Sequence, residues 1–125
     1  MYALIWRYRI KPDAEEQFLE HYGPKGSWAR LFGRAPGYLG TELLESGSVE
    51  REFATIDRWE SEAHHRAFLE EFRDEYAALD AACEAMTEAE LERVEQGVNE
   101  AILRNYQLNI QLKPREQALQ EGAMA

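Results

Sequence analysis

Two of the three histidines in this sequence are adjacent, at His64 and His65, and histidine is the side chain best suited to move a proton near pH 7. They follow Trp59 closely and come a few residues before Phe68. On a helix, adjacent side chains project about 100° apart, so at most one of the two can face the interior. We predict His65 as the general base of a site, with Trp59 beside it.

A structural interpretation competes with this chemistry. Both histidines could be exposed residues in the first turn of a helix, and a tryptophan at a strand end is more often part of a core than of a catalytic site. Proton transfer to an oxygen-reactive substrate needs a dry pocket around the base. Whether His65 lines such a pocket therefore decides between the two interpretations.

Aromatic side chains gather near the start of the chain and could form a wall for a flat, hydrophobic ligand. They lie in a predicted strand, in the helix after it and in the next helical segment: Trp6, Tyr8, Tyr22 and Trp28. Packing in a core or a dimer interface would explain the same rings. Arg7, Arg9 and Arg58 could hold an acidic group, but nearby carboxylates are their more ordinary partners.

The sequence offers little for metal or thiol chemistry. No histidine pair has His-x-x-x-His spacing, and His21 is distant from the other two, so we expect no metal site. Cys83 is the only cysteine, which excludes an internal disulfide and fits a reducing compartment. We expect a cytoplasmic protein that needs no cofactor.

Charge narrows the range of partners. The 125 residues carry 24 acidic and 14 basic side chains, a formal charge of −10. Residues 61–100 alone carry 12 acidic and 3 basic side chains, so most of the excess lies in one stretch. A field of this sign repels phosphate backbones and anionic lipids, and no apolar run is long enough to span a bilayer. We expect no nucleic-acid partner and no membrane.

Hydrophobic periodicity and turn residues divide the chain into strands and helices in a mixed order. Residues 2–10 alternate as a strand with large side chains on both faces, and Ser61 precedes a long helical pattern that ends near Cys83. The remaining predicted elements are a helix opening at Asp13, a helical segment at 26–34, strands at 38–45 and 49–59, a helix at 88–104 and a strand at 106–112.

This order matches an α+β fold of the ferredoxin-like, split βαβ type, with an antiparallel sheet and helices on one face. We assign one domain to residues 1–112, with an atypical part at 87–112 and a tail at 113–125. Because the first strand carries large side chains on both faces, the open face of the sheet needs a cover. A second copy of the chain is the simplest cover, so we predict a homodimer through that face.

Two motifs resemble the antibiotic biosynthesis monooxygenase domain of the dimeric α/β-barrel superfamily. They are Gly-Tyr-Leu-Gly-Thr-Glu-Leu-Leu at 37–44 and Asp-Arg-Trp-Glu-Ser-Glu-Ala-His at 57–64, with Phe68 beyond. The resemblance covers residues 1 to about 90. It implies a dimeric α/β barrel, with an apolar pocket between sheet and helices in each protomer. It also implies oxygenation of aromatic, polyketide-like substrates by molecular oxygen without metal, flavin or haem.

The resemblance carries over to individual positions only in part. The tryptophan that closes the third strand of the family matches Trp59. Polyketide-anthrone oxygenases of the family have an asparagine four residues earlier and a tyrosine six residues later, where this chain has Thr55 and His65. Haem-degrading relatives use an asparagine in the first strand, which is absent, and a histidine at the position of Leu69. Haem degradation is therefore not implied.

The hypothesis is a cofactor-independent monooxygenase that oxidises a small hydrophobic aromatic or quinol-type substrate with molecular oxygen. His65 and Trp59 are the predicted catalytic residues. The predicted substrate contacts are Trp6, Tyr22, Trp28, Thr55 and Phe68. Two alternatives stay open: a non-catalytic protein that binds such a ligand, and an isomerase or decarboxylase on the same fold.

The C-terminal part departs from the family pattern. The family domain ends with a strand soon after its second long helix, and 91–98 could be a degenerate form of that strand. We favour an inserted helix at 88–104 instead, because Thr87-x-x-Glu90 is a capping box and apolar residues recur at helical spacing from Leu91. The strand at 106–112 would then close the domain.

Overall fold

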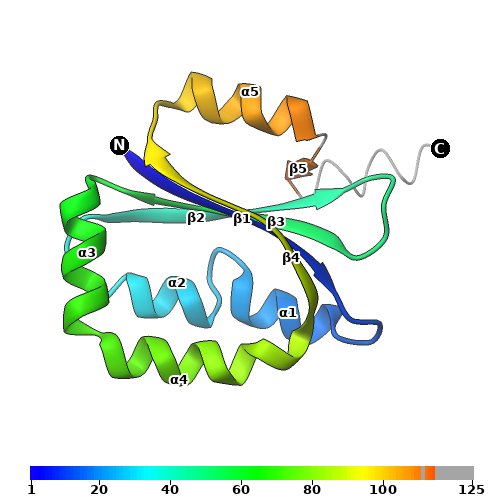
Figure 1. Cartoon of the computed structure of the whole chain (residues 1–125), viewed down its shortest axis with the longest axis horizontal. Coiled ribbons are helices and arrows are strands. Elements are labelled where there is room, and N and C mark those ends of the chain that lie inside the picture. Colours follow the sequence, from blue (N-terminus) through cyan, green and yellow to red (C-terminus); the bar gives the residue numbers. More distant parts are fainter. Residues whose placement is uncertain (111, 115–125) are drawn as a thin grey trace.

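A computed structural model describes residues 1–110 and 112–114 as a five-stranded antiparallel sheet with helices on both faces (Figure 1). The strand order is β4-β1-β3-β2-β5. The elements are β1 (Tyr2–Ile10), α1 (Glu15–Tyr22), α2 (Ser27–Phe32), β2 (Tyr38–Ser46), β3 (Glu52–Trp59), α3 (Glu62–Glu71), α4 (Arg73–Cys83), a 3₁₀ turn (Glu84–Met86), β4 (Thr87–Gly97), α5 (Glu100–Ile110) and β5 (Leu112–Pro114).

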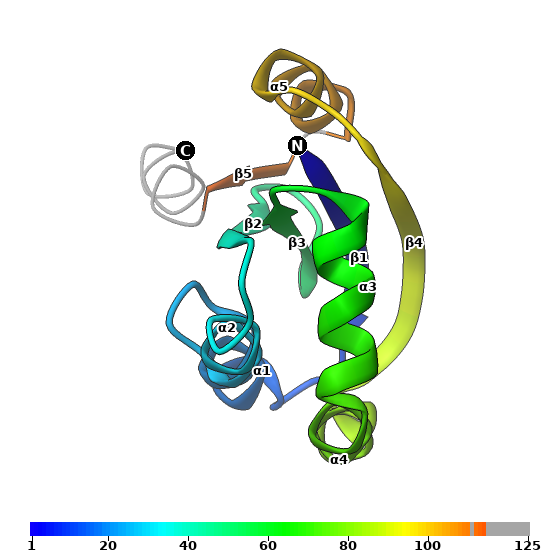
Figure 2. The same ribbon diagram turned by 90° about the vertical axis from the view of Figure 1, so that its left-hand side faces the viewer.

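The alternation in β1 produces two buried faces, as the sequence predicted. On one face, Tyr2 and Leu4 belong to the core under the helices, and on the other, Ala3 and Ile5 belong to a second core. Figure 2 shows the central strands between α5 on one side and α1, α2 and α4 on the other. The antiparallel register sets Trp6 opposite Thr55, which brings predicted site residues from β1 and β3 side by side.

The long helical pattern after Ser61 forms two helices that run in different directions (Figure 1). The Ser61 hydroxyl accepts a hydrogen bond from the His64 backbone N–H, which begins α3 as expected. The helix breaks at Phe72, whose φ of −106° and ψ of 28° lie outside the helical range. The break lets α3 cover the end of the sheet while α4 runs beneath it.

The predicted helix at 88–104 and the predicted strand at 106–112 are both wrong. Residues 87–97 form β4, which pairs with β1 along its length, and residues 100–110 form α5. Only part of the apolar spacing is used in the strand: Val94 and Val98 pack on the sheet face that holds Ile5, whereas Leu91 is 37% exposed. Pairing with the unfilled edge of β1 outweighs the local helical signal. The degenerate family strand was therefore the correct alternative, and of the predicted tail at 113–125 only 113 and 114 are described.

Helix α5 covers much of the sheet face that we expected a second copy to cover. Leu103 is 1% exposed and packs on Ala3, Ile5 and Ile56. The start of α5 is capped by Asn99 Oδ1, which accepts from the Ile102 backbone N–H at 2.9 Å.

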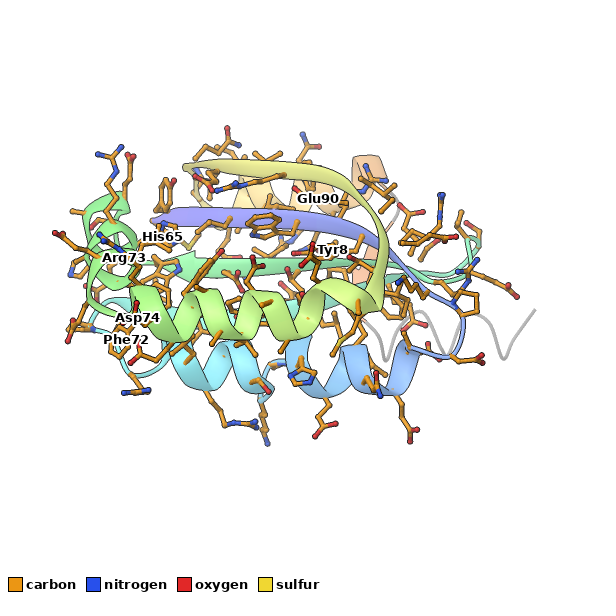
Figure 3. All side chains as sticks on the ribbon, turned by 60° about the horizontal axis from the view of Figure 1, so that its bottom comes forward. Tyr8, His65, Phe72, Arg73, Asp74 and Glu90 are labelled. Atoms are coloured by element: carbon orange, nitrogen blue, oxygen red, sulfur yellow. The ribbon has the colours of Figure 1, made fainter. Side chains whose placement is uncertain are left out.

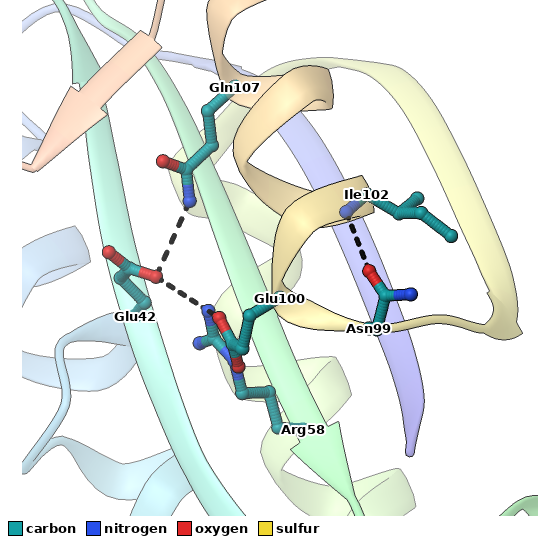
Figure 4. A network of polar contacts seen from close by, with 6 residues as sticks. All are labelled: Glu42, Arg58, Asn99, Glu100, Ile102 and Gln107. Atoms are coloured by element: carbon teal, nitrogen blue, oxygen red, sulfur yellow. Dashed lines mark hydrogen bonds and ion pairs between the residues drawn. The ribbon is translucent and has the colours of Figure 1, made fainter.

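Charged side chains tie α5 to the sheet (Figure 4). Arg58 Nε donates to Glu100 Oε1 at 2.8 Å, and Arg58 Nη2 donates to Glu42 Oε1 at 3.0 Å. Gln107 Nε2 lies 3.5 Å from the same Glu42 oxygen. Arg58 is therefore used in the packing of α5 rather than in binding an acidic ligand.

The turn before β2 has a tight steric requirement. Gly37 has φ +90°, and a Cβ built there would lie 2.4 Å from the His64 ring. Gly37→Ala should therefore lower the free energy of unfolding by about 2 kcal/mol, through backbone strain and displacement of His64. Urea denaturation measures the change.

The matched control is Gly47→Ala, because a Cβ at Gly47 meets no atom within 4 Å. The second control, His64→Ala in the Gly37→Ala background, removes the ring atoms from the clash but leaves the Cβ of residue 64, 2.7 Å away, and the backbone strain, so it should recover only part of the loss. Equal stability of the Gly37 and Gly47 variants would contradict the prediction.

Candidate active site

A cavity of about 270 Å³ lies between the helix-facing side of the sheet and helices α1, α2, α3 and α4. All three tryptophans of the chain line it. The lining residues are Leu4, Trp6, Tyr8, Tyr22, Trp28, Phe32, Thr41, Thr55, Asp57, Trp59, His65, Tyr76, Asp80, Cys83, Glu84, Thr87 and Glu90.

Six of the seven predicted site residues line this cavity: Trp6, Tyr22, Trp28, Thr55, Trp59 and His65. Phe68 does not line it, because it is buried behind Trp59 with the two ring centroids 5.3 Å apart. The structure thus brings the predicted residues together, while their catalytic and binding roles stay predictions.

Of the two adjacent histidines, His65 faces the cavity and His64 does not. The His65 ring packs edge-on against Trp59, with centroids 5.4 Å apart, and also lies against Tyr2. Burial lowers the pKa of His65, because the charged imidazolium loses hydration there. His65 is therefore a neutral imidazole at pH 7, while the His64 ring hydrogen-bonds the Ser61 hydroxyl at 2.7 Å.

The cavity also contains a buried carboxyl group, that of Asp57, which is not among the predicted site residues. Its side chain is 7% exposed, and Thr41 Oγ1 donates to its Oδ1 at 2.7 Å. The Tyr38 hydroxyl in turn donates to Thr41 Oγ1, since the threonine proton is already used. Burial raises the pKa of Asp57 to about 6, and the hydrogen bond from Thr41 opposes this rise only in part.

Neutral phenols surround this carboxyl group. Burial raises the pKa of Tyr8 and of Tyr76, and the negative charge of Asp57 raises both further. Burial and the same charge raise the pKa of Tyr38 to about 12. These tyrosines therefore remain protonated at neutral pH, and Tyr8 and Tyr76, which line the cavity, can donate hydrogen bonds to a ligand oxygen.

Two indole donors in the wall have no acceptor among the described residues. Trp59 Nε1 is buried without a hydrogen bond, and so is Trp28 Nε1, although it lies close to the Tyr22 hydroxyl and the Cys83 thiol. An unpaired buried donor costs about 1–3 kcal/mol. The wall therefore contains polar groups that its own side chains leave unsatisfied.

The lining residues of the cavity differ from one end of the sheet to the other (Figure 3). His65 lies at the α3 end, whereas Tyr8 and Glu90 lie opposite each other in the register of β1 and β4 toward the other end. Asp80, Glu84 and Glu90 are exposed at the rim. The buried end is thus aromatic with one carboxyl group, and the open end is acidic.

A signal for Asp57 was present in the sequence. In a strand, alternate residues share a face, so Asp57 must share the face of Phe53, Thr55 and Trp59. Because Thr55 and Trp59 are predicted site residues, a carboxylate on their face belongs to the same site. Thr41, its hydrogen-bond partner from β2, carried no comparable signal, because its register with Asp57 depends on the pairing of the two strands.

The chain belongs to the antibiotic biosynthesis monooxygenase family, because the family model with that description matches residues 1–83. The helix-on-sheet architecture and the position of the cavity agree with the fold that the sequence motifs implied. No curated protein matches the chain.

Solved structures with the same fold include three informative neighbours. SnoaB, a cofactor-independent oxygenase from Streptomyces nogalater, is 17% identical with a TM-score of 0.61, and the match covers 79% of this chain and 93% of that one. An antibiotic biosynthesis monooxygenase from Nitrosomonas europaea is 19% identical with a TM-score of 0.58, covering 78% and 98%. One from Chloroflexus aurantiacus is 18% identical with a TM-score of 0.60, covering 78% and 93%.

Two further observations concern residues 1–110 and 112–114. No described helix is long and apolar enough to cross a membrane. Within the same residues, no group of three or more His, Cys, Asp or Glu side chains is arranged to hold a metal ion.

The raised pKa of Asp57 predicts how stability depends on pH. Asp57 binds its proton more tightly in the folded state than in the unfolded state. The free energy of unfolding of the protein therefore falls as pH rises from the unfolded pKa of 3.8 to the folded pKa of about 6. The full loss corresponds to about 3 kcal/mol. Asp57→Asn should therefore be more stable than the wild type at about pH 7.5 and nearly equal to it at about pH 4.

Thermal unfolding of both proteins across this pH range measures the difference. Asp74→Asn is the control, because Asp74 is exposed on α4 and lies outside the cavity. An Asp57→Asn variant that is less stable than the wild type at every pH would show that the carboxylate is favourably bound, contrary to this account.

Proposed function

We propose that this protein is a cofactor-independent monooxygenase that oxidises a small hydrophobic aromatic or quinol-type substrate with molecular oxygen. The observation that carries the proposal is one buried carboxyl group, Asp57, whose pKa of about 6 suits a general base, inside a cavity walled by aromatic rings. Membership of the monooxygenase family supports the reaction class, and the fold of SnoaB supports the absence of a cofactor.

The base would start the reaction. Asp57 takes a proton from a phenolic hydroxyl or from an acidic C–H between aromatic rings, and the resulting anion is electron-rich enough to reduce oxygen. Because the carboxylate is poorly hydrated in the cavity, it accepts the proton more readily than an exposed aspartate does. Ionised Asp57 is the majority form at pH 7.

The oxygen step balances without an added reductant. The substrate anion transfers one electron to molecular oxygen, and the substrate radical and superoxide combine to form a peroxide anion at carbon, which takes up one proton to become the hydroperoxide. Loss of water from a hydroperoxide that still carries a C–H bond leaves a carbonyl group. Overall, a CH₂ group and one oxygen molecule give a C=O group and one water.

The other cavity residues have roles that follow from their protonation. The phenols of Tyr8 and Tyr76 are neutral donors that can stabilise the substrate oxyanion. His65 is a neutral imidazole and can exchange a proton with the peroxide, while Trp59 holds its ring in place from the edge. Trp6, Tyr22, Trp28 and Thr55 would contact the substrate, and Phe68 would support Trp59 from behind.

The alternatives differ in what the cavity must contain. A protein that only sequesters a hydrophobic ligand has no need of a buried carboxyl group and a buried histidine in the same cavity, so this lining favours an enzyme. An isomerase or decarboxylase would use the same base but would consume no oxygen. The experiment below separates these cases.

Oxygen uptake by purified, metal-free protein tests the proposal against a panel of anthrones, naphthols and hydroquinones. We expect uptake without added cofactor, with kcat/KM rising with pH around an apparent pKa near 6 because the base must be ionised. Asp57→Asn should lower the rate at least a hundredfold and His65→Gln about tenfold.

Glu75→Gln is the matched control, because Glu75 is exposed on α4 and does not line the cavity. Full activity in Asp57→Asn would contradict the assignment of the base. Substrate conversion without oxygen uptake would indicate the isomerase or decarboxylase, and ligand binding without any conversion would indicate the binding protein.

The proposal includes a cytoplasmic location and a homodimer, supported by the family to which the chain belongs. Because α5 covers the apolar part of the sheet face, a partner copy would meet α5 as well, where Ile102 is 47% exposed. We expect a dimer in sedimentation equilibrium and a weaker dimer for Ile102→Glu. A wild-type chain that is monomeric at all concentrations would contradict this part of the proposal.

A further inference from the structure

We infer that the ligand of this cavity carries a positive charge, as an aromatic compound with a protonated amine. The inference rests on the proposed function only in taking this cavity as the substrate site. It concerns which substrates the site selects, and binding can be measured without any reaction.

The charges in the lining all have one sign. Four carboxyl groups line the cavity, from β3, α4, the 3₁₀ turn and β4: Asp57, Asp80, Glu84 and Glu90. None of the lining residues among the described chain is a lysine or an arginine. The one histidine in the lining is neutral at pH 7 because burial lowers its pKa. An anionic ligand would therefore meet repulsion at both ends of the cavity.

Aromatic rings fill the wall between the two ends. Five of them come from β1, α1, α2 and α4: Trp6, Tyr8, Tyr22, Trp28 and Tyr76. The faces of such rings attract cations through their quadrupole, and more strongly where water is excluded. An acidic mouth that leads into an aromatic wall is thus suited to a cation that is also hydrophobic.

The protein already places one of its own cations on this wall. The guanidinium of Arg93 lies over the Trp6 ring, 4.5 Å from its centroid. Arg93 also pairs with Glu95 and does not line the cavity. The contact shows that the Trp6 ring binds a cation in this protein.

One carboxylate oxygen of Asp57 is left for the ligand. Asp57 is 93% buried, and Thr41 donates to its Oδ1, whereas no described residue donates to its Oδ2. A ligand hydroxyl or N–H at that oxygen would complete its hydrogen bonding. A ligand with a hydroxyl at Asp57, its ring among the tryptophans and its ammonium toward Glu84 and Glu90 would satisfy both ends.

The test uses three catechols whose side chains are small and differ in charge. Dopamine is a cation at pH 7, 4-methylcatechol is neutral and 3,4-dihydroxyphenylacetate is an anion. Titration calorimetry under anaerobic, metal-free conditions measures the affinity of each without turnover. We expect dopamine to bind at least tenfold more tightly than the anion and more tightly than the neutral compound, with a difference that shrinks as salt is added.

Variants at the rim separate charge from shape. Glu84→Gln combined with Glu90→Gln should lower the ratio of dopamine to 4-methylcatechol affinity by about three- to tenfold, while binding of 4-methylcatechol stays within about twofold. The control, Glu71→Gln combined with Glu75→Gln, changes the net charge equally on exposed residues outside the cavity and should leave the ratio unchanged.

Each outcome of these binding experiments either supports or overturns the inference. Equal or reversed preference among the three catechols, a rim variant that behaves like the control, or no binding of any of them at millimolar concentration would overturn the inference. Preferential binding of dopamine together with no oxygen uptake on any substrate would support the inference while overturning the proposed oxygenase, so the two failures are distinguishable.

Discussion

The proposed site depends on one unfavourable placement: the carboxyl group of Asp57 lies where water hydrates it poorly. Asp57 lies on the helix-facing side of the central strand β3, among aromatic rings, with a single hydrogen bond from Thr41. Such a position destabilises the ionised form and so raises the pKa to about 6. A protein that had no use for this group would be more stable with an apolar or amide side chain there. Buried groups with strongly shifted pKa values concentrate at functional sites for this reason.

The sheet is what makes this placement possible. Because β3 is flanked by β1 and β2, its helix-facing residues are surrounded by side chains of both neighbours: Thr41 from β2 on one side and Trp6 from β1 on the other. On the opposite face, α5 is tied down by the ion pairs of Arg58 and buries the apolar half of the sheet. The two faces thus have separate tasks. One forms the cavity, and the other forms a second core, to which Leu103 of α5 contributes from outside the residues 1–83 that the family model matches.

The sequence predicted the parts of the fold that local patterns determine. The alternation of β1, the cap at Ser61 and the motifs around Trp59 identified the sheet, the start of α3 and six cavity residues. It failed at 87–110, where a capping-box pattern and helical spacing competed with pairing to the edge of β1, and the non-local pairing prevailed. The predicted site also lacked Asp57. Histidine was the expected base because its ordinary pKa is near 7, but burial raises the pKa of Asp57 to about 6 and lowers the pKa of His65.

The most direct test of the central claim is a pH titration of the Asp57 carboxyl carbon by ¹³C NMR, with its signal assigned from the Asp57→Asn spectrum. The account predicts a midpoint near pH 6 in the free protein. A midpoint for Asp57 near the ordinary value of 3.8 would contradict the account, because an aspartate of ordinary pKa at this position would have neither the burial nor the basicity on which the site depends.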